Sequence, residues 1–313
     1  MNSLENFRVI VFRTVAEQSS FRKAAEKLYL TQPAVSLQIK ALEEELGVLL
    51  FSRAAAQISM TKAGEILFAY SEAVRGLRVQ AQADIAGLSG EHTGNLALGA
   101  STTIAQYLLP QLLAEFNHEL PHVRLTLMSG NTEHIVNALE EQKIGLGLIE
   151  GPPRNRDVKT EAFLEDELVL IASTAHEFSE RNSVSASDLA RWPLLLRERG
   201  SGSRHVLELA LEQAGIKRNS LKVVMELDST EAIKSAVEAG LGVGFVSRWA
   251  IAKDLRLNFA FKVVDVGGLQ VRRQFLIASP PGPEPMGLAK EFRRYLIGRA
   301  GAQRLEPQAN MLK

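Results

Sequence analysis

The sequence of 313 residues contains no cysteine. This absence excludes disulfide bonds, thiolate metal ligands and a cysteine nucleophile, and it fits a cytoplasmic protein. Long apolar runs are also missing, since none approaches the roughly 20 residues that a membrane-spanning helix needs. The N-terminal segment carries Glu5 and Arg8 and lacks the continuous apolar core of a signal peptide. We therefore expect a cytoplasmic protein with no membrane partner.

Motifs of common enzyme classes are missing as well. The stretch Gly200–Arg204 lacks the Gly-Lys-Ser/Thr ending of a phosphate-binding loop, and no Gly-x-Gly-x-x-Gly motif follows the first strand of the α/β region. No Gly-x-Ser-x-Gly motif with triad partners occurs, and the six histidines show no metal-ligand spacing. Catalysis is therefore an alternative that no motif supports, and we expect no metal and no cofactor.

Charge of neither sign predominates, because 36 Lys and Arg residues balance 36 Asp and Glu residues. The chain is thus no polycation, and any DNA binding has to depend on a local basic patch. Residues 1–62 hold eight basic and six acidic residues, a net charge of +2, which predicts only modest non-specific affinity for DNA. Aromatic residues make up 6% of the chain, which argues against a large aromatic ligand.

The stretch from Ser19 to Gly47 has the pattern of two short helices joined by a tight turn. The first helix starts at Ser19 or Ser20, since either residue is a good N-cap. Thr31 caps the second helix, and Pro33 occupies its first turn, where a missing N–H costs nothing. The second helix is expected to end at Gly47. Its expected buried residues are Ala34, Val35, Ile39, Leu42 and Leu46.

The opposite face of the second helix carries small polar and basic side chains, which hydrogen-bond base edges and phosphates in DNA complexes. This arrangement indicates a helix-turn-helix whose second helix is the recognition helix. The alternative is an ordinary helical hairpin with a solvated face. The candidate DNA-binding residues are Arg22, Lys23, Thr31, Gln32, Pro33, Ser36, Gln38, Lys40 and Arg53.

Further elements are expected on both sides of this motif. Residues 3–18 are predicted to form a helix capped by Ser3, and residues 49–60 to form a short β wing. Residues 61–88 are predicted to form one long helix with an apolar seam at spacings of three and four. A small domain cannot bury so long a seam, so we expect dimerisation rather than a helix that lies on its own protein. The seam comprises Leu67, Tyr70, Val74, Leu77, Ala81, Ile85 and Leu88.

From residue 95 onward the pattern changes to alternating strands and helices, which is typical of an α/β fold with mainly parallel sheets. Glycines between residues 87 and 94 predict a hinge before this region. Residues 300–313 are polar and expected to be frayed. Strands are predicted at 96–100, 123–128, 145–149, 168–172, 194–196, 222–227, 243–246 and 273–278, and helices at 103–118, 132–142, 203–214, 229–239 and 285–297.

The sequence FRKAAEKLYLTQPAVSLQIKALEEELGVLLFSR, followed by Thr61-Lys62-Ala63-Gly64, resembles the winged helix-turn-helix of the LysR-type transcriptional regulators. The resemblance extends to about Gly298 and implies two Rossmann-like subdomains similar to a periplasmic binding protein. It also implies the domain boundaries. These are a winged helix-turn-helix at 1–60, a linker and dimerisation helix at 61–91, an effector-binding domain at 92–300 and a flexible tail at 301–313, with subdomain I at 92–165 and 268–300 and subdomain II at 166–267.

Two features depart from the family pattern. Leu37 stands where the family often has arginine on the recognition helix, and Ala54, Ala55 and Ala56 stand where the wing usually carries basic residues. Both departures remove contacts to phosphates or bases. Because affinity for DNA follows the number of neutralised phosphates, we expect weaker or more strictly dimer-dependent DNA binding than is typical of the family.

Several strand-to-helix junctions of the α/β region are rich in hydroxyl groups. Open α/β sheets bind ligands beyond the carboxyl ends of their strands, and helix N-termini bind anions. The alternative is that the hydroxyl residues at these junctions only cap the helices and bind no ligand. Glu150 ends a strand near the same cleft. Its negative charge disfavours a large polyanion as ligand, unless the side chain faces away or accepts a hydrogen bond from the ligand. The candidate effector-binding residues are Ser101, Thr102, Thr103, Asn131, Glu150, Ser201, Ser203, Thr230 and Ser247, with Arg204 or Arg197 as the charged partner.

The stretches GASTTIAQYLLP, GNTEHI and RERGSGSR resemble those of one LysR subgroup, the regulators of sulfur-assimilation genes that sense small oxyanions such as sulfite. This resemblance implies an activator, with operator DNA, RNA polymerase and a small anionic effector as partners. It also implies a homodimer or homotetramer. A cytosolic solute-binding protein without DNA function is the alternative, but it leaves the helix-turn-helix and the long seam unexplained.

Overall fold

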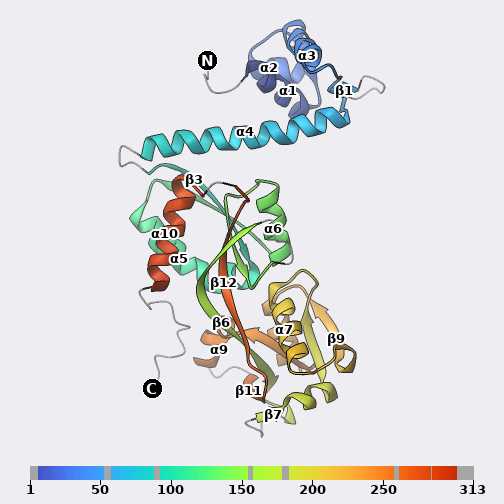
Figure 1. The fold of residues 1–313 in the computed structure, drawn as a ribbon, viewed down its shortest axis with the longest axis vertical. Coiled ribbons are helices and arrows are strands. Elements are labelled where there is room, and N and C mark those ends of the chain that lie inside the picture. The colour runs from blue at the N-terminus through green and yellow to red at the C-terminus, as the bar shows by residue number, and fades with distance from the viewer. Residues whose placement is uncertain are drawn as a thin grey trace. The chain divides into compact units, whose positions relative to one another are not determined.

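The computed structural model describes residues 6–52, 58–87, 92–153, 158–177, 183–256, 261–282 and 284–301 (Figure 1). The chain divides into two compact units, residues 1–85 and residues 86–313. The first unit contains the helix-turn-helix and the long helix, and the second contains the α/β region.

Three helices form the first unit's core. Helix α1 (Phe7–Gln18) begins later than predicted: its cap is Asn6, whose side chain accepts a hydrogen bond from the Arg8 N–H at 3.0 Å, and the expected cap Ser3 lies outside the described residues. Helix α2 (Phe21–Leu28) is capped by Ser20 and followed by Tyr29 in the left-handed conformation. Helix α3 (Gln32–Leu46) is capped by Thr31 and followed by Gly47 with φ 69°, as predicted.

The core of this unit lies between the three helices and the first wing strand. Val11, Phe12 and Val15 of α1 pack with Val35 and Ile39 of α3. Each of these side chains is almost completely buried, and they recur at the helical spacing that the sequence shows. The prediction for the end of α3 is wrong: Leu46 is 46% exposed, because the last turn of the helix extends beyond this core.

A short antiparallel pair forms the wing, with strand β1 (Phe51–Ser52) against β2 (Ser59–Met60). The Glu43 carboxylate at the end of α3 accepts hydrogen bonds from the N–H groups of Leu50 at 2.7 Å and Phe51 at 3.3 Å. It thereby fixes the start of the wing to α3. Arg53 and the alanines at 54–56 lie outside the described residues, so the prediction of a weakened wing stays a prediction.

Helix α4 (Lys62–Gly87) is the predicted long helix. Its first turns pack on the core of the unit through Leu67. Farther along, the apolar seam is uncovered in the single chain: Tyr70 is 70% exposed, Val74 48%, Leu77 57% and Ile85 65%. None of the helices in the described ranges is long and apolar enough to span a membrane.

The second unit contains one mixed sheet flanked by helices. Its strands are β3 (Gly94–Ser101), β4 (Val123–Gly130), β5 (Leu146–Glu150), β6 (Lys159–Ser173), β7 (Ser183–Ser185), β8 (Pro193–Arg197), β9 (Lys222–Leu227), β10 (Val243–Ser247), β11 (Phe261–Gly267) and β12 (Val271–Ser279). Its helices are a π-helix (Ile104–Leu108) that continues into α5 (Leu109–Glu119), then α6 (Thr132–Glu140), α7 (Gly202–Gln213), α8 (Thr230–Glu238), α9 (Arg248–Arg256) and α10 (Gly287–Gly301), with 3-10 turns at Ala186–Arg191 and Arg218–Ser220.

Two long strands join the halves of this sheet. The strand order is β4-β3-β5-β12-β6-β10-β8-β9, and β11 pairs with β6 and β7. Strands β3, β4 and β5 are parallel to one another, and β8 is parallel to both β9 and β10. Strands β6 and β12 cross between the halves and pair antiparallel (Figure 1). The prediction of mainly parallel sheets therefore holds within each half and is wrong for the crossing strands.

Each half has its own hydrophobic core. Helices α5 and α10 pack on one face of the first half, where the rings of Phe116 and Phe292 meet with their centroids 4.9 Å apart. In the second half, α7 packs Val206, Leu207 and Leu211 against β8 and β10. The unit thus consists of two α/β subdomains connected by β6 and β12.

Candidate functional site

The outward face of α3 is the candidate DNA-binding surface. Gln32 and Pro33 in the first turn are exposed, and Ser36 is half-buried one turn later. The Gln32 amide donates to the Ser36 hydroxyl at 3.3 Å, which orients two groups able to hydrogen-bond base edges. Thr31 itself is used as the helix cap, since its hydroxyl accepts from the Ala34 N–H at 3.4 Å.

The basic residues around this face are exposed but partly compensated. Lys40 lies 3.7 Å from the Glu44 carboxylate, and Arg22 lies 3.4 Å from that of Glu26. Such exposed pairs are weak, so both cations are able to exchange these partners for phosphates. Lys23 is also exposed, whereas Gln38 is half-buried.

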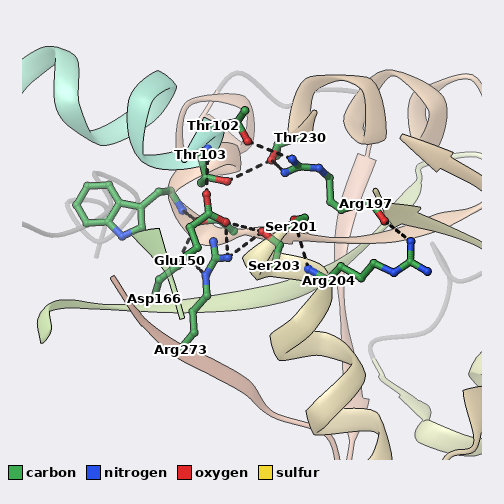
Figure 2. A network of polar contacts seen from close by, with 12 residues as sticks. Thr102, Thr103, Glu150, Asp166, Arg197, Ser201, Ser203, Arg204, Thr230 and Arg273 are labelled. Carbon is green, nitrogen blue, oxygen red and sulfur yellow. Dashed lines mark hydrogen bonds and ion pairs between the residues drawn. The ribbon is translucent and has the colours of Figure 1, made fainter. Parts of the chain in front are cut away.

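In the second unit, the ends of strands from both subdomains meet in a network of polar contacts (Figure 2). Arg197, at the end of β8 and 4% exposed, is its central cation. Its guanidinium donates to the hydroxyl of Thr102 at 3.2 Å in the first subdomain and to that of Thr230 at 3.3 Å in the second. It is also held by the Glu198 carboxylate at 2.9 Å and by the Asp228 carbonyl at 3.1 Å. Arg197 therefore links the two subdomains.

Hydroxyl groups continue the contact between the subdomains. The hydroxyls of Thr103 and Thr230 lie 3.3 Å apart, and both residues are buried. Gly202, the first residue of α7, approaches the end of β5 so closely that an added Cβ would meet the Glu150 carbonyl oxygen at 1.9 Å and the Thr132 hydroxyl at 2.5 Å. That Thr132 hydroxyl is buried and has no hydrogen-bond partner in the part of the chain that the structure describes. A buried hydroxyl without a hydrogen-bond partner is able to bind a polar ligand group.

Beside these hydroxyls lies a buried ion cluster of Arg273, Glu150 and Asp166, which we call the hinge cluster. Arg273 on β12 donates to Glu150 at 2.6 Å and to Asp166 on β6 at 2.7 Å, and its side chain is fully buried. Ser203 of α7 donates to Glu150 at 2.6 Å, and Ser247 donates to Asp166 at 2.8 Å. Arg273 and Asp166 are direct neighbours in the β6–β12 pairing. The cluster therefore sits where the chain crosses between subdomains.

The two carboxyl groups of the hinge cluster respond differently to this environment. Burial by itself raises the pKa of Glu150, but the Arg273 guanidinium and the Ser203 hydroxyl outweigh it and bring this pKa down to about 2. Burial also raises the pKa of Asp166, and there it prevails over the attraction of Arg273. Glu150 is thus an ionised partner of Arg273, and it holds the N–H of Thr103 at 3.1 Å.

The remaining predicted residues are used locally. Asn131 and Ser201 serve as N-caps of α6 and α7, which is the alternative interpretation of these junctions. Ser101 is buried next to Thr102. The guanidinium of Arg204 points away from the other hydroxyls (Figure 2) and pairs with Glu208 at 2.9 Å. Arg204 also donates to the Arg197 carbonyl at 2.9 Å. Of the two arginines considered for the charged partner, Arg197 is therefore the one whose guanidinium contacts the hydroxyls of Thr102 and Thr230.

Sequence reasoning missed a second contact between the subdomains. Tyr107 on the π-helix donates its hydroxyl to Glu231 of α8. Lys234 lies over the Tyr107 ring at 5.5 Å from its centroid and pairs with Asp254 of α9 at 2.6 Å. No sequence pattern predicts the π-helical turn that carries Tyr107, but such turns are frequent at functional sites.

A pocket of about 580 Å³ opens beside the hinge cluster. It is lined by the crossing strands and by the start of α9, including Asp166, Arg273 and the Trp249 ring. No group of three or more histidine or carboxylate side chains in the described ranges is placed to hold a metal ion. Around Arg197 the arrangement offers a guanidinium beside the hydroxyls of Thr102 and Thr230, and these groups are able to bind an anion.

Family models match both units of the chain. The model described as "Bacterial regulatory helix-turn-helix protein, lysR family" matches residues 8–65. The model described as "LysR substrate binding domain" matches residues 89–301. Together they cover most of the chain.

Curated relatives align over almost the whole length. A probable RuBisCO transcriptional regulator of Cyanidioschyzon merolae is 36% identical, covering 92% of this chain and 95% of its own. The HTH-type transcriptional activator CmpR of Synechocystis is 36% identical over 92% and 93%. The RuBisCO operon transcriptional regulator of Allochromatium vinosum is 34% identical over 95% and 96%.

Solved structures share the fold. A full-length OxyR variant from Pseudomonas aeruginosa superimposes with a TM-score of 0.67 at 24% identity, covering 96% of this chain and 95% of its own. CbnR in complex with its target DNA gives a TM-score of 0.65 at 20% identity over 94% and 98%. The regulatory domain of Synechocystis CcmR in complex with 2-PG gives 0.59 at 25% identity, over 66% of this chain and 98% of that domain.

Proposed function

We propose a regulatory mechanism for this chain, which belongs to the LysR family of DNA-binding transcriptional regulators and carries their effector-binding domain. A small anion binds in the cleft between the two subdomains, next to Arg197. Its binding changes how the helix-turn-helix units engage operator DNA. The observation that carries the proposal is the position of Arg197, a buried cation that holds hydroxyls of both subdomains, Thr102 and Thr230.

An effector reaches Arg197 only when the subdomains loosen. Arg197 is 4% exposed, and its donors are taken up by Glu198, Thr102, Thr230 and the Asp228 carbonyl. An entering anion takes over contacts that the two threonine hydroxyls make now. Ligand-free and ligand-bound states then differ in how the subdomains are joined, and a ligand shifts the balance only through that difference in affinity.

The crossing strands are the proposed hinge of this movement. We place the boundary between subdomain I and subdomain II near residues 165 and 268, as the family resemblance implies. The core of the second subdomain runs from Leu168 on β6 to Val271 on β12, and Phe163 and Phe275 belong to the core of the first, which supports these positions. Arg273 and Asp166 sit at this boundary, so the hinge cluster limits where the strands are able to bend.

The effector's chemical class follows from the donors around Arg197. Hydroxyls and one guanidinium suit a compact oxyanion or a small carboxylate or phosphate. The resemblance to sulfite-sensing regulators suggested a sulfur oxyanion. The relatives at 34–36% identity, however, are RuBisCO transcriptional regulators and the transcriptional activator CmpR. We therefore propose carbon-fixation genes as targets in place of sulfur-assimilation genes. CcmR, whose structure contains 2-PG, supports a small anion as effector.

The exposed seam of α4 is the proposed dimer contact. Tyr70, Val74, Leu77 and Ile85 form an apolar stripe that a second copy of the helix would cover. A homodimer, or a homotetramer built from two such pairs, places two helix-turn-helix units on a pseudo-palindromic operator. Activation through contact with RNA polymerase, in the cytoplasm, completes the proposed function.

A thermal-shift panel on the purified protein tests the effector class. The panel holds sulfite, sulfate, phosphate, 2-PG, O-acetylserine and benzoate, each at matched ionic strength, with sodium chloride as the control. An anion at about 100 times its dissociation constant stabilises the folded domain by about 2.7 kcal/mol. We expect a rise in melting temperature of roughly 5–10 °C for at least one small anion. A shift with benzoate alone would contradict a site around Arg197 that is sized for a compact, non-aromatic anion.

A further inference from the structure

The recognition helix α3 presents an apolar side chain at the centre of its outward face. Leu37 is 64% exposed. It follows the buried Val35 by two residues, which is about 200° around an α-helix. Leu37 therefore points almost directly away from the core that Val35, Ile39 and Leu42 help to form. Pro33, one turn earlier and also exposed, lies on the same face.

Polar groups surround this apolar pair. Gln32 and Ser36 are joined by their 3.3 Å hydrogen bond on one side, and Lys40 stands one turn farther along the helix. None of the hydrophobic clusters formed by the described residues of this unit includes Leu37. Single exposed leucines are common on protein surfaces. What distinguishes Leu37 is its position on the outward face of α3, the proposed DNA-binding surface, beside Ser36 and Lys40.

We propose that Leu37, supported by Pro33, determines operator specificity by contacting the C5-methyl group of a thymine in the major groove. The inference rests on the proposed role of α3 as the recognition helix. Leu37 is the sixth residue of α3, within the N-terminal half that contacts base edges in helix-turn-helix complexes. A leucine has no hydrogen-bond donor or acceptor, so it is unable to select guanine or adenine. The thymine methyl is the one apolar group that a base offers in this groove.

The proposed Leu37 contact is uncharged, in contrast to a contact between Lys40 and a phosphate. Leu37 neutralises no phosphate, so its contribution to operator affinity does not weaken with salt, whereas that of Lys40 does. The operator is therefore expected to contain a thymine in each half-site whose methyl group is needed even at high salt.

The experiment removes that methyl group and nothing else. The full-length protein selects its operator from random DNA, and each thymine of the selected half-site is then replaced by deoxyuracil. Dissociation constants are measured for the wild type, Leu37→Ala and Leu37→Met, with Leu46→Ala as a control that shortens an exposed leucine at the other end of the same helix. Since Leu37 is exposed, none of these changes removes a core contact.

One thymine position is expected to respond. Deoxyuracil there weakens binding by the wild type, by Leu37→Met and by Leu46→Ala about fourfold per half-site. Leu37→Ala binds the thymine operator more weakly and shows no further loss with deoxyuracil. Leu37→Arg steepens the salt dependence of binding by about one unit of slope.

Two outcomes separate this inference from the proposed function. If an operator is selected but no thymine responds to deoxyuracil, or if Leu37→Ala keeps the full response, the role of Leu37 is wrong while sequence-specific DNA binding stands. If no operator is enriched at all, the proposed DNA-binding function itself is contradicted.

Discussion

Replacing Arg197 with glutamine is expected to abolish the response to the effector while operator binding without effector persists. The side chain is 4% exposed and makes direct contacts with both subdomains. Removing one partner of a buried charged contact costs about 2–5 kcal/mol, so effector affinity is expected to fall by at least about 30-fold. Isothermal titration calorimetry with the anion that shifts the melting temperature most measures this loss.

A second arginine supplies the control. Arg199 lies two residues beyond Arg197, just after the end of β8, is exposed, and carries the same charge. Arg199→Gln therefore changes the net charge of this region equally but leaves the contacts to Thr102 and Thr230 intact. Equal losses of effector affinity in the two variants would contradict a specific role of Arg197 and would indicate a general effect of positive charge.

Replacing Arg273 with methionine is expected to destabilise the effector-binding domain severely. The substitution keeps most of the side-chain volume but leaves the carboxylates of Glu150 and Asp166 without their cation, in a site where the Arg273 side chain is 0% exposed. Breaking a buried ion pair from one side costs about 3–5 kcal/mol. For a domain of this size, the melting temperature is expected to fall by about 10 °C, as measured by calorimetry on the full-length protein.

The neighbouring Arg272 provides a matched substitution. It lies on the same strand and is exposed, so Arg272→Met removes an equal charge without leaving a carboxylate unpaired in the interior. The melting temperature of this variant is expected to stay within about 2 °C of the wild type, because surface substitutions usually change stability by less than about 0.5 kcal/mol. A small effect of Arg273→Met, similar to that of Arg272→Met, would show that the hinge cluster does not stabilise the fold.

Elements fixed by local sequence were predicted well. The caps Ser20, Thr31 and Gly47 bound the two helices of the helix-turn-helix where the sequence indicated. Their conformations depend mainly on neighbouring residues. Strand β9 also has the predicted bounds, Lys222–Leu227. The same local reasoning failed at Leu46, because whether a side chain is buried depends on how far the partner elements extend.

Features that depend on distant pairing were not predicted. Asp166 and Arg273 are 107 positions apart and become neighbours only when β6 pairs antiparallel with β12. Neither residue stands at a strand-to-helix junction, where the sequence pattern predicted the ligand contacts. Likewise, Tyr107 and Glu231 come from different subdomains. The hydroxyl-rich junctions were visible in sequence, but local pattern was unable to separate the N-caps Asn131 and Ser201 from the bridging threonines.

The comparison with relatives also changes which effector we propose. The sequence stretches around the cleft suggested sulfite-sensing regulators, yet the full-length matches carry names from carbon fixation. A cradle of hydroxyls around one arginine recognises charge and size more than chemical identity, because sulfur and phosphorus oxyanions offer similar acceptor oxygens. The thermal-shift panel therefore includes both sulfur and phosphorus oxyanions.

The central claim is that an anion between the subdomains and operator DNA at the helix-turn-helix influence each other's binding. The most direct test titrates the anion with the largest thermal shift into the full-length protein, with and without saturating operator duplex. The two anion dissociation constants are expected to differ by at least about fivefold, and the anion is expected to change operator affinity by the same factor, since such coupling is reciprocal. Equal anion affinities with and without operator would contradict the account.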